Sequence, residues 1–390
     1  MTDFEFYTPT KVIFGQGAVS GIGKEAAPLG KTALLLYGRD SLKKNGLYDL
    51  IHRELGKQGI RIVEHPGVQP NPVLPHAEEG VRICRSEGVD FIVAAGGGSV
   101  IDEAKGIAAG FYADKDLWEY YSKRAVVDKA LPIIAVQTQP ATSSETNAAS
   151  VLTNPERGEK FGLRSPYMIP KAAFLDPSVT FTIPVQYTAY ACFDILCHML
   201  EGYFTTTAEF SPIQDGFVEG LSKGVMESLA RVLKNPEDYD SRASIMWAGA
   251  LAWNGLANAG LEGAHIPSHM FEHPLSGLYD IPHGAGLAVV MPAWLKFMKD
   301  RISRRIILFG KKILGIENLD ESDPSAACDT VIGAFEEFIR SIGCPLSLSE
   351  TGIDSPDIQE LTKQVNALSV LWNIQGYSDK DIAEIYELCL

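Results

Sequence analysis

The sequence has few basic side chains for its size. Its 390 residues carry 34 Lys and Arg against 49 Asp and Glu, which gives a formal net charge of −15. Proteins that bind nucleic acid or an anionic membrane surface need clustered positive charge, so this balance argues against both kinds of partner. An anionic cofactor must therefore be held by local contacts rather than by the overall field.

Long hydrophobic runs are also missing. The longest, LAVVMPAWL at 287–295, is far shorter than the roughly 20 residues that cross a bilayer. The first 17 residues carry acidic side chains and lack the apolar core of a signal peptide. We therefore expect no transmembrane segment, no secretion signal and a cytoplasmic location.

The cysteines form no C-x-x-C pair. They are scattered through mostly apolar stretches, which is typical of reduced thiols in a cytosolic protein. Two of them lie beside a histidine-rich segment, and we interpret both as small buried hydrophobic residues rather than as metal ligands. The six are Cys84, Cys192, Cys197, Cys328, Cys344 and Cys389.

The first half of the chain alternates between strand and helix patterns. Helical periodicity at 46–59 and 73–88 separates short apolar or β-branched runs, which lie at 32–37, 60–65, 91–98 and 131–138. This alternation predicts a parallel sheet with helices on its faces. Ligands of such sheets bind at the carboxyl ends of the strands.

From about residue 184 the strand pattern stops. Long, mostly amphipathic helical stretches follow, punctuated by Pro and Gly, at 184–204, 212–235, 242–260, 329–343 and 355–368. We therefore predict an α/β domain over 1–183 and an all-helical domain over 184–390. The length of the chain also favours two domains.

Two turns after predicted strands are candidates for binding phosphate. The first is Gly38-Arg39-Asp40-Ser41, and the second is Gly96-Gly97-Gly98-Ser99, which leads into a helix. Glycines let the backbone approach a pyrophosphate, Ser99 could cap the helix, and the N–H groups of its first turn favour anionic oxygen. The G-x-G-x-x-G fingerprint is absent, so a tight strand-to-helix connection remains the alternative.

The segment TQPATSSETN at 138–147 follows the fourth predicted strand. Its small hydroxyl residues could bind phosphate, nicotinamide and substrate, or form an ordinary polar loop. Lys160 follows soon after and could offset phosphate charge, although a surface position is the alternative.

Five of the eight histidines fall in one stretch of the second half. Asp194 and His198 are spaced i,i+4, as are His269 and His273, so each pair shares a helix face. His283 follows PLSGLYDIP, in which Pro274, Gly277 and Pro282 would let the chain turn back. The fifth histidine is His265.

A carboxylate with three imidazoles suits Fe(II), Zn or Mn, and no thiolate set competes with it. Each residue alone could instead be an ordinary helix-face residue. Four protein ligands could close a structural zinc site, whereas Fe(II) would keep room for a substrate oxygen. The residues favour metal binding and leave both kinds of site open.

Taken together, these segments resemble the iron-containing, or group III, alcohol dehydrogenases, and most closely their butanol dehydrogenase and broad-range aldehyde reductase branch. The resemblance covers nearly the whole chain. It is carried by TPTKVIFGQGA, YGRDSLKKNGLYD, GVQPNP, GGGSVIDEAKGIA, PATSSETN, LDPSVTFTIP, FDILCHMLE, YDSRASIMWAGALAWNG and HMFEHPLSGLYDIPHGAGLAVVMP.

The resemblance implies a dehydroquinate synthase-like architecture, with a dinucleotide-binding domain before a metal-binding helical one. It implies that Asp194, His198, His269 and His283 hold Fe(II), or alternatively Zn, and that His273 is a catalytic non-ligand. His265 has no implied role. The implied activity is interconversion of small primary alcohols and aldehydes by hydride transfer with NAD(P)(H), in a homodimer. Polyol oxidation like that of glycerol dehydrogenase, or a dehydroquinate synthase-like lyase reaction, are the alternatives on the same fold.

The resemblance also implies a cofactor site and one departure from the family. Asp40 would favour the free ribose hydroxyl of NAD and Arg39 the 2′-phosphate of NADP, and we favour NADP(H) over NAD(H). Where the family often has T-G-S-E, this chain has Ser143 in place of the glycine. The implied cofactor-binding residues are Gly38, Arg39, Asp40, Ser41, Asn71, Gly97, Gly98, Ser99, Asp102, Thr138, Thr142 and Lys160.

Overall fold

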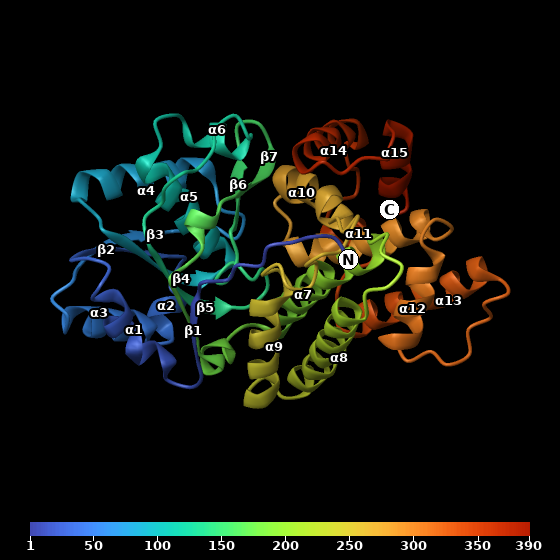
Figure 1. The fold of residues 1–390 in the computed structure, drawn as a ribbon, viewed down its shortest axis with the longest axis horizontal. Helices are drawn as coiled ribbons and strands as arrows, with labels where there is room; N and C mark the ends of the chain where they lie inside the picture. The colour runs from blue at the N-terminus through green and yellow to red at the C-terminus, as the bar shows by residue number, and fades with distance from the viewer. The chain divides into compact units, whose positions relative to one another are not determined.

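A computed structural model describes residues 1–390 (Figure 1). The chain divides into two compact units, each held together by its own internal contacts. One contains residues 7–183 and 237–254, and the other contains residues 1–6, 184–236 and 255–390. One limit between them falls at 183/184, but each unit is assembled from separate segments of the chain. The predicted division into domains at that point stays a prediction.

The first unit is built on a sheet of six strands that are all parallel, in the order β1-β8-β5-β4-β2-β3. A separate antiparallel pair is formed by β6 and β7. The strands are β1 (Lys11–Phe14), β2 (Thr32–Tyr37), β3 (Arg61–Pro66), β4 (Phe91–Gly97), β5 (Ile133–Gln139), β6 (Ala149–Asn154), β7 (Glu159–Arg164) and β8 (Ala172–Leu175).

Strands β2, β4 and β5 lie inside the sheet and are buried over almost their whole length. Their Val, Ile, Leu and Ala side chains face helices on both sides, which is why they are continuous apolar runs rather than alternating ones. The predicted parallel sheet is therefore confirmed.

The helices of this unit are α1 (Ile22–Ala26), α2 (Ser41–Lys44), α3 (Leu47–Gly56), α4 (Leu74–Glu87), α5 (Gly98–Tyr112), α6 (Leu117–Tyr121) and α9 (Tyr239–Ala252), with short 3-10 turns η1 (Ala18–Gly21), η2 (Pro166–Met168) and η3 (Pro177–Thr180). Helices α1 and α3 lie on one face of the sheet and α4 and α5 on the other (Figure 1), while α6 packs on β6 and β7 and α9 on η3. Helix α9 follows the first helices of the other unit in sequence, yet it belongs here.

The second unit is helical throughout, as predicted. Its elements are α7 (Val185–Thr205), α8 (Pro212–Lys234), α10 (Pro267–Tyr279), α11 (His283–Met298), α12 (Ser303–Lys312), α13 (Pro324–Ser341), η4 (Ser349–Thr351), α14 (Ile358–Trp372) and α15 (Asp379–Glu387). None of the helices in the chain combines the length and apolar character that a membrane span requires.

Helix α7 is the buried centre of this unit and packs against α8, α10 and α11. The prediction that Pro274 and Gly277 turn the chain was wrong, because Pro274 lies inside α10, which runs on to Tyr279. The turn is made by Asp280, which adopts a left-handed conformation with φ of 52° and ends the helix. His283 then begins α11.

Candidate functional site

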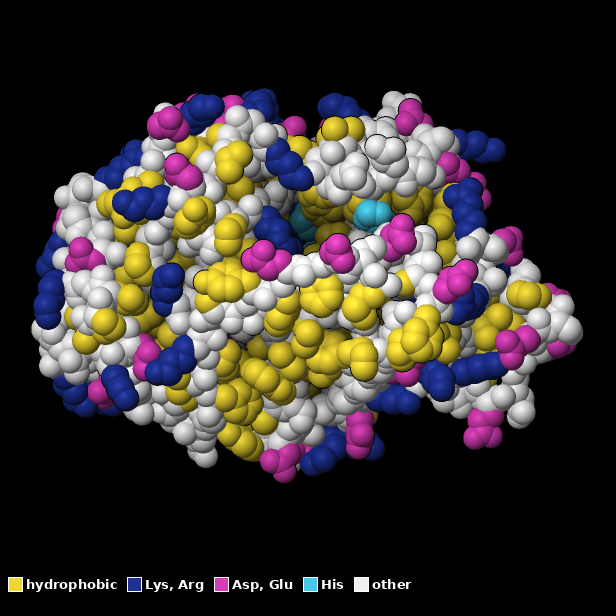
Figure 2. Space-filling view, in the orientation of Figure 1, with side chains coloured by type: hydrophobic (Ala, Val, Ile, Leu, Met, Phe, Trp, Pro, Cys, Tyr) yellow, Lys and Arg dark blue, Asp and Glu magenta, His cyan; other side chains and the backbone are white.

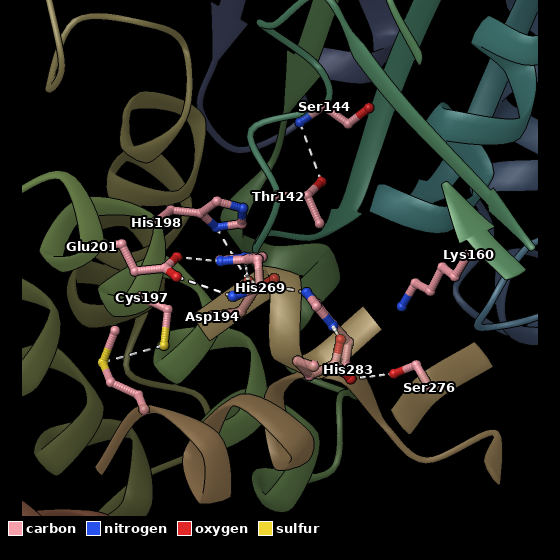
Figure 3. Close-up of polar contacts among 12 residues, drawn as sticks. Thr142, Ser144, Lys160, Asp194, Cys197, His198, Glu201, His269, Ser276 and His283 are labelled. Carbon is pink, nitrogen blue, oxygen red and sulfur yellow. Dashed lines mark hydrogen bonds and ion pairs between the residues drawn. The ribbon is translucent and has the colours of Figure 1, made fainter. Parts of the chain in front are cut away.

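Four side chains from three helices meet at one point in the helical unit (Figure 3). Asp194 and His198 come from α7, His269 from α10 and His283 from the first turn of α11. The Asp194 Oδ1 atom lies 3.2 Å from His198 Nδ1, 3.4 Å from His269 Nε2 and 3.8 Å from His283 Nε2. The structure thus brings together all four residues that the resemblance implies as metal ligands.

Two atoms at the centre of this cluster are buried without a hydrogen-bond partner. They are Asp194 Oδ1 and His269 Nε2. Buried polar atoms are nearly always paired, and an exception calls for an explanation such as an ion. A carboxylate oxygen and imidazole nitrogens facing one another are the donor set of a borderline divalent cation, so these residues fit Fe(II) or Zn.

The charges in the cluster favour an ionised carboxylate. Burial alone would raise the pKa of Asp194, but His198, His269 and His283 outweigh it and hold that pKa well below its usual range. Burial lowers the pKa of His198. Burial also disfavours the charged form of His269, but Glu201 and Asp194 outweigh it and raise the pKa of His269 to about 10. A metal needs an ionised carboxylate and neutral imidazoles as ligands, so its binding would displace the extra proton from His269.

His273 and His265 occupy different environments. The His273 ring is buried, with its centroid 6.5 Å from that of His269 and 5.6 Å from that of His283. His265 is exposed and uses its backbone to pair with Thr205. His273 therefore borders the ligand cluster, while His265 lies outside it. Figure 2 shows histidine side chains reaching the surface beside hydrophobic ones.

In the α/β unit, the glycine turn after β4 leads straight into α5, which begins at Gly98. Gly97 is the N-cap and offers no side chain, so the N–H groups of the first turn are free to meet an anion. The prediction that Ser99 caps this helix was wrong. The Ser99 hydroxyl donates to the Pro70 carbonyl instead, because the 66–73 loop lies against the turn.

The loop after β5 is tied to the same helix. Ser144 Oγ donates to Asp102 Oδ1, and Val151 N donates to Asp102 Oδ2 at 3.0 Å. Asp102 is buried with both oxygens occupied by protein donors. It therefore holds the loop against α5, while Thr142 packs against Gly98 so closely that a Cβ on Gly98 would lie 2.4 Å from Thr142 Oγ1.

The remaining predicted cofactor residues come from several segments of the α/β unit, and Lys160 lies near the start of β7. Residues 38–41 follow β2, and Thr138 lies near the end of β5. Lys160 Nζ donates to Asn71 Oδ1 at 3.1 Å, so two residues 89 positions apart are brought together. The side chain of Asp40 makes no capping hydrogen bond to α2.

The chain matches the family description "Iron-containing alcohol dehydrogenase" over residues 9–177 and "Fe-containing alcohol dehydrogenase family, C-terminal" over 188–390. It is 35% identical over 390 residues to the NADH-dependent butanol dehydrogenase A of Clostridium acetobutylicum, covering 99% of both chains. The chain belongs to the iron-containing alcohol dehydrogenase family. The predicted family, and with it alcohol and aldehyde interconversion as the class of activity, are confirmed.

Two further relatives support this placement. The NADPH-dependent aldehyde reductase YqhD of Escherichia coli is 33% identical over 368 residues, with 94% of this chain and 93% of that one covered. The crystal structure of an NADH-dependent butanol dehydrogenase A from Thermotoga maritima superimposes with a TM-score of 0.95 at 38% identity, covering 100% of this chain and 99% of that one. The two-unit fold of this dehydrogenase is therefore that of its family.

The sequence interpretation of this dehydrogenase missed two carboxylates beside the candidate ligands. Glu201 contacts His269 Nδ1, and Glu272 contacts His283 Nδ1. The available signal was spacing: Glu201 lies seven residues after Asp194, and Glu272 three after His269, which puts each on the face of its helix that carries a ligand. Cys197, by contrast, packs against Met291 Sδ at 3.7 Å in the core.

A second group of potential ligands lies in the α/β unit of the dehydrogenase. His65, His76 and Glu103 have donor atoms within 4.8 Å of one another. The two rings are stacked, with centroids 4.0 Å apart and planes at 11°. Nitrogen lone pairs of parallel stacked rings lie in separate planes and do not converge. His76 instead contacts Glu103 at 2.5 Å and Pro66 O at 3.1 Å, which describes a hydrogen-bonded ion pair.

Proposed function

We propose that this protein interconverts small primary alcohols and aldehydes with a nicotinamide cofactor, using one divalent metal held by Asp194, His198, His269 and His283. The observation that carries the proposal is the convergence of three imidazoles within 3.8 Å of Asp194 Oδ1, a buried oxygen that makes no hydrogen bond. The names of the relatives, butanol dehydrogenases and an aldehyde reductase, support the substrate class.

The metal is proposed to be Fe(II), with Zn as the alternative. When bound, it would supply Lewis-acid polarisation of the substrate oxygen. A catalytic site needs access, and the His283 side chain keeps 22% of its surface exposed, against 5% for Asp194 and 4% for His269. This opening at one ligand supports a catalytic metal over a closed structural one.

His273 is proposed to move the proton of the reacting hydroxyl. Its ring lies beside the rings of His269 and His283, next to two of the proposed ligands. The edge-to-face ring of Trp372, with its centroid 4.9 Å away, packs against His273. This packing fixes the imidazole and keeps bulk water from one side of it.

The cofactor is proposed to bind at the carboxyl ends of β2, β4 and β5. The first-turn N–H groups of α5 would receive the pyrophosphate, and Gly97 keeps the backbone accessible. Asn71 and Lys160 would add a polar and a cationic contact. Arg39 is proposed to favour NADP(H), since its exposed guanidinium follows β2 and can pair with a 2′-phosphate. The bound nicotinamide would exchange hydride with the substrate carbon.

Turnover of butanal tests the proposal. Oxidation of NADPH or NADH followed by absorbance, dependent on butanal and lost after treatment with a chelator, is expected. A lyase of the dehydroquinate synthase kind would convert a sugar phosphate without net loss of reduced cofactor. Absence of turnover with short-chain aldehydes and alcohols in the metal-loaded protein would contradict the proposal.

We also propose a cytoplasmic homodimer. All six cysteines are buried and none forms a disulfide, which supports a reducing compartment. In the α/β unit, β1 is an edge strand and carries the exposed side chain of Phe14, which contacts the half-exposed Trp247. An unpaired edge with apolar side chains supports association with a second copy. Light scattering of the purified protein measures the mass directly.

A further inference from the structure

Two fully buried carboxylates contact two of the proposed metal ligands, at the ring nitrogen that does not face Asp194. Glu201, on α7, contacts the His269 ring at Nδ1 through Oε2, and its other oxygen accepts the backbone N–H of His269 at 3.0 Å. Glu272, on α10, contacts His283 at Nδ1 through Oε2. Both glutamates have no solvent exposure. Figure 3 shows the Glu201 side chain pointing at His269.

These contacts decide which imidazole nitrogen is available. A carboxylate accepts a hydrogen bond, so the ring nitrogen that faces it carries the proton, and the lone pair is left on the other nitrogen. Nδ1 faces the carboxylate in both rings. In a neutral ring with its proton on Nδ1, the lone pair is on Nε2. Both Nε2 atoms face a second carboxylate, Asp194 Oδ1, at 3.4 Å for His269 and 3.8 Å for His283, so a cation between them would satisfy the lone pairs and that oxygen together.

Gly286 leaves space for the Glu272 side chain, and Ser276 holds its second carboxylate oxygen. A Cβ on Gly286 would lie 2.8 Å from Glu272 Cγ and from Oε1, so any larger residue there would displace the carboxylate. Ser276 donates its hydroxyl to Glu272 Oε1. Glu201 is fixed similarly, because its two oxygens receive the backbone and the ring of the same residue, His269.

The charges of the cluster also favour a bound cation. Asp194, Glu201 and Glu272 place three carboxylates in one buried region. Buried carboxylates are costly unless a positive charge or a full set of hydrogen bonds compensates them. A divalent cation coordinated by the Nε2 atoms and Asp194 would supply that charge.

We infer that Glu201 and Glu272 are positioning residues that hold His269 and His283 in the tautomer that binds metal through Nε2. This inference rests on the proposed function, because it needs the four-ligand metal site. Glu272 also has a possible ligand atom within 4.8 Å of those of His273 and His283. Its Oε2 contacts His283 Nδ1 and its Oε1 accepts the Ser276 hydroxyl, so we do not propose it as a ligand. Each glutamate acts through its histidine, by fixing the ring orientation and making the ligand nitrogen more basic.

The test is Zn²⁺ affinity, measured by competition with a chelator at one pH, for Glu201→Gln, Glu272→Gln and wild type. In Glu201→Gln an amide N–H₂ must face either the His269 backbone N–H or the ring N–H, so one contact becomes repulsive. The dissociation constant of each variant should rise by about 10- to 100-fold, as outer-shell changes do. Glu336→Gln is the matched control, since it removes a surface ion pair with Lys296 on α11.

A purely structural role would lower the melting temperature of the metal-free protein and leave the Zn²⁺ affinity of the folded fraction unchanged. That result, or variants that bind as tightly as wild type, would overturn the inference. If Glu201→Gln does not fold, Glu201→Asp replaces it. That variant keeps the charge but is one methylene shorter, and its affinity should fall between those of wild type and Glu201→Ala.

The proposed metal site is checked in the same titration with His269→Ala. Wild type should bind one equivalent of Zn²⁺ that this variant loses. If both bind alike, the four-ligand site itself is wrong, and the inference falls with it. If only the glutamate variants match wild type, the site stands and the positioning role is rejected.

Discussion

Ser143 Oγ accepts the backbone N–H of Trp253 at 2.7 Å and donates to the carbonyl of Gly249. One hydroxyl thus joins the loop after β5 to the end of α9, across more than 100 residues of sequence. Ser143 does this from a left-handed conformation, with φ of 52°, which a glycine adopts more easily. The two hydrogen bonds offset the strain, and they explain how a serine stands where the family often has glycine.

Ser143→Ala should be more destabilising than Ser143→Gly. The alanine keeps the left-handed strain and removes the two hydrogen bonds of the hydroxyl, each worth about 0.5–1.5 kcal/mol. The glycine loses the same hydrogen bonds but relieves about 1 kcal/mol of strain. Calorimetric melting of the three proteins measures the order. A glycine variant that melts below the alanine variant would show that the hydroxyl contacts do not compensate strain.

Arg39→Ala should reduce the preference for NADPH over NADH. A charge-assisted hydrogen bond contributes about 1.5–3 kcal/mol, so the ratio of kcat/KM values should fall by about 10- to 100-fold. Asp40→Asn should shift the ratio the other way, because it removes a negative charge near the 2′-phosphate. Arg53→Ala, on the exposed surface of α3, is the control. A wild type that prefers NADH, or a ratio that Arg39→Ala leaves unchanged, would refute the role of Arg39.

Gly97→Val should raise the cofactor KM by about tenfold or more while the protein stays folded, because its branched side chain would cover the N–H groups at the start of α5. A Cβ at this position would lie 3.3 Å from Gln139 Cβ, a contact that small shifts can accommodate. Gly220→Val is the control, since no atom lies within 4 Å of a Cβ there. An unchanged cofactor KM in Gly97→Val would show that the glycine turn is only a tight strand-to-helix connection and does not bind the cofactor.

The His76–Glu103 pair should make stability depend on pH. Its hydrogen bond to Glu103 raises the pKa of His76 above the ordinary 6.5, against the opposing effect of burial. The contribution is therefore complete below pH 6.5 and is lost as the pH rises through the folded-state pKa. The advantage of wild type over His76→Gln should be about 1–3 kcal/mol at pH 6 and shrink toward pH 9. A difference from His76→Gln that grows with pH would contradict the pairing.

Much of the fold could be predicted from local patterns. Buried parallel strands are continuous apolar runs, and β2 was placed at its observed bounds of 32–37. Strands β1 and β8, of four residues each, were not predicted, because so short a segment has no periodicity to detect. They join the sheet through pairing with each other and with β5, which no local pattern encodes.

In the candidate site, too, local spacing could be read from the sequence, whereas contacts between distant residues could not. The i,i+4 spacing of Asp194 and His198 predicts a shared helix face without knowledge of the tertiary fold. What Ser99 contacts depends on Pro70, 29 residues earlier, so its capping role could not be judged from the sequence. Glu201 and Glu272 were missed for a similar reason, since an acidic residue on a helix is ordinarily assigned to solvent.

The most direct test of the account is the metal content and activity of His269→Ala, His283→Ala and His273→Ala beside wild type. The first two variants should lose the metal and lower kcat/KM by more than about 100-fold, beyond what an outer-shell change produces. His273→Ala should keep one metal per chain and lose about 100-fold or more in kcat, as expected for a proton-transfer residue. Full metal content in both His269→Ala and His283→Ala would contradict the account, because the cluster around Asp194 would then not be the metal site.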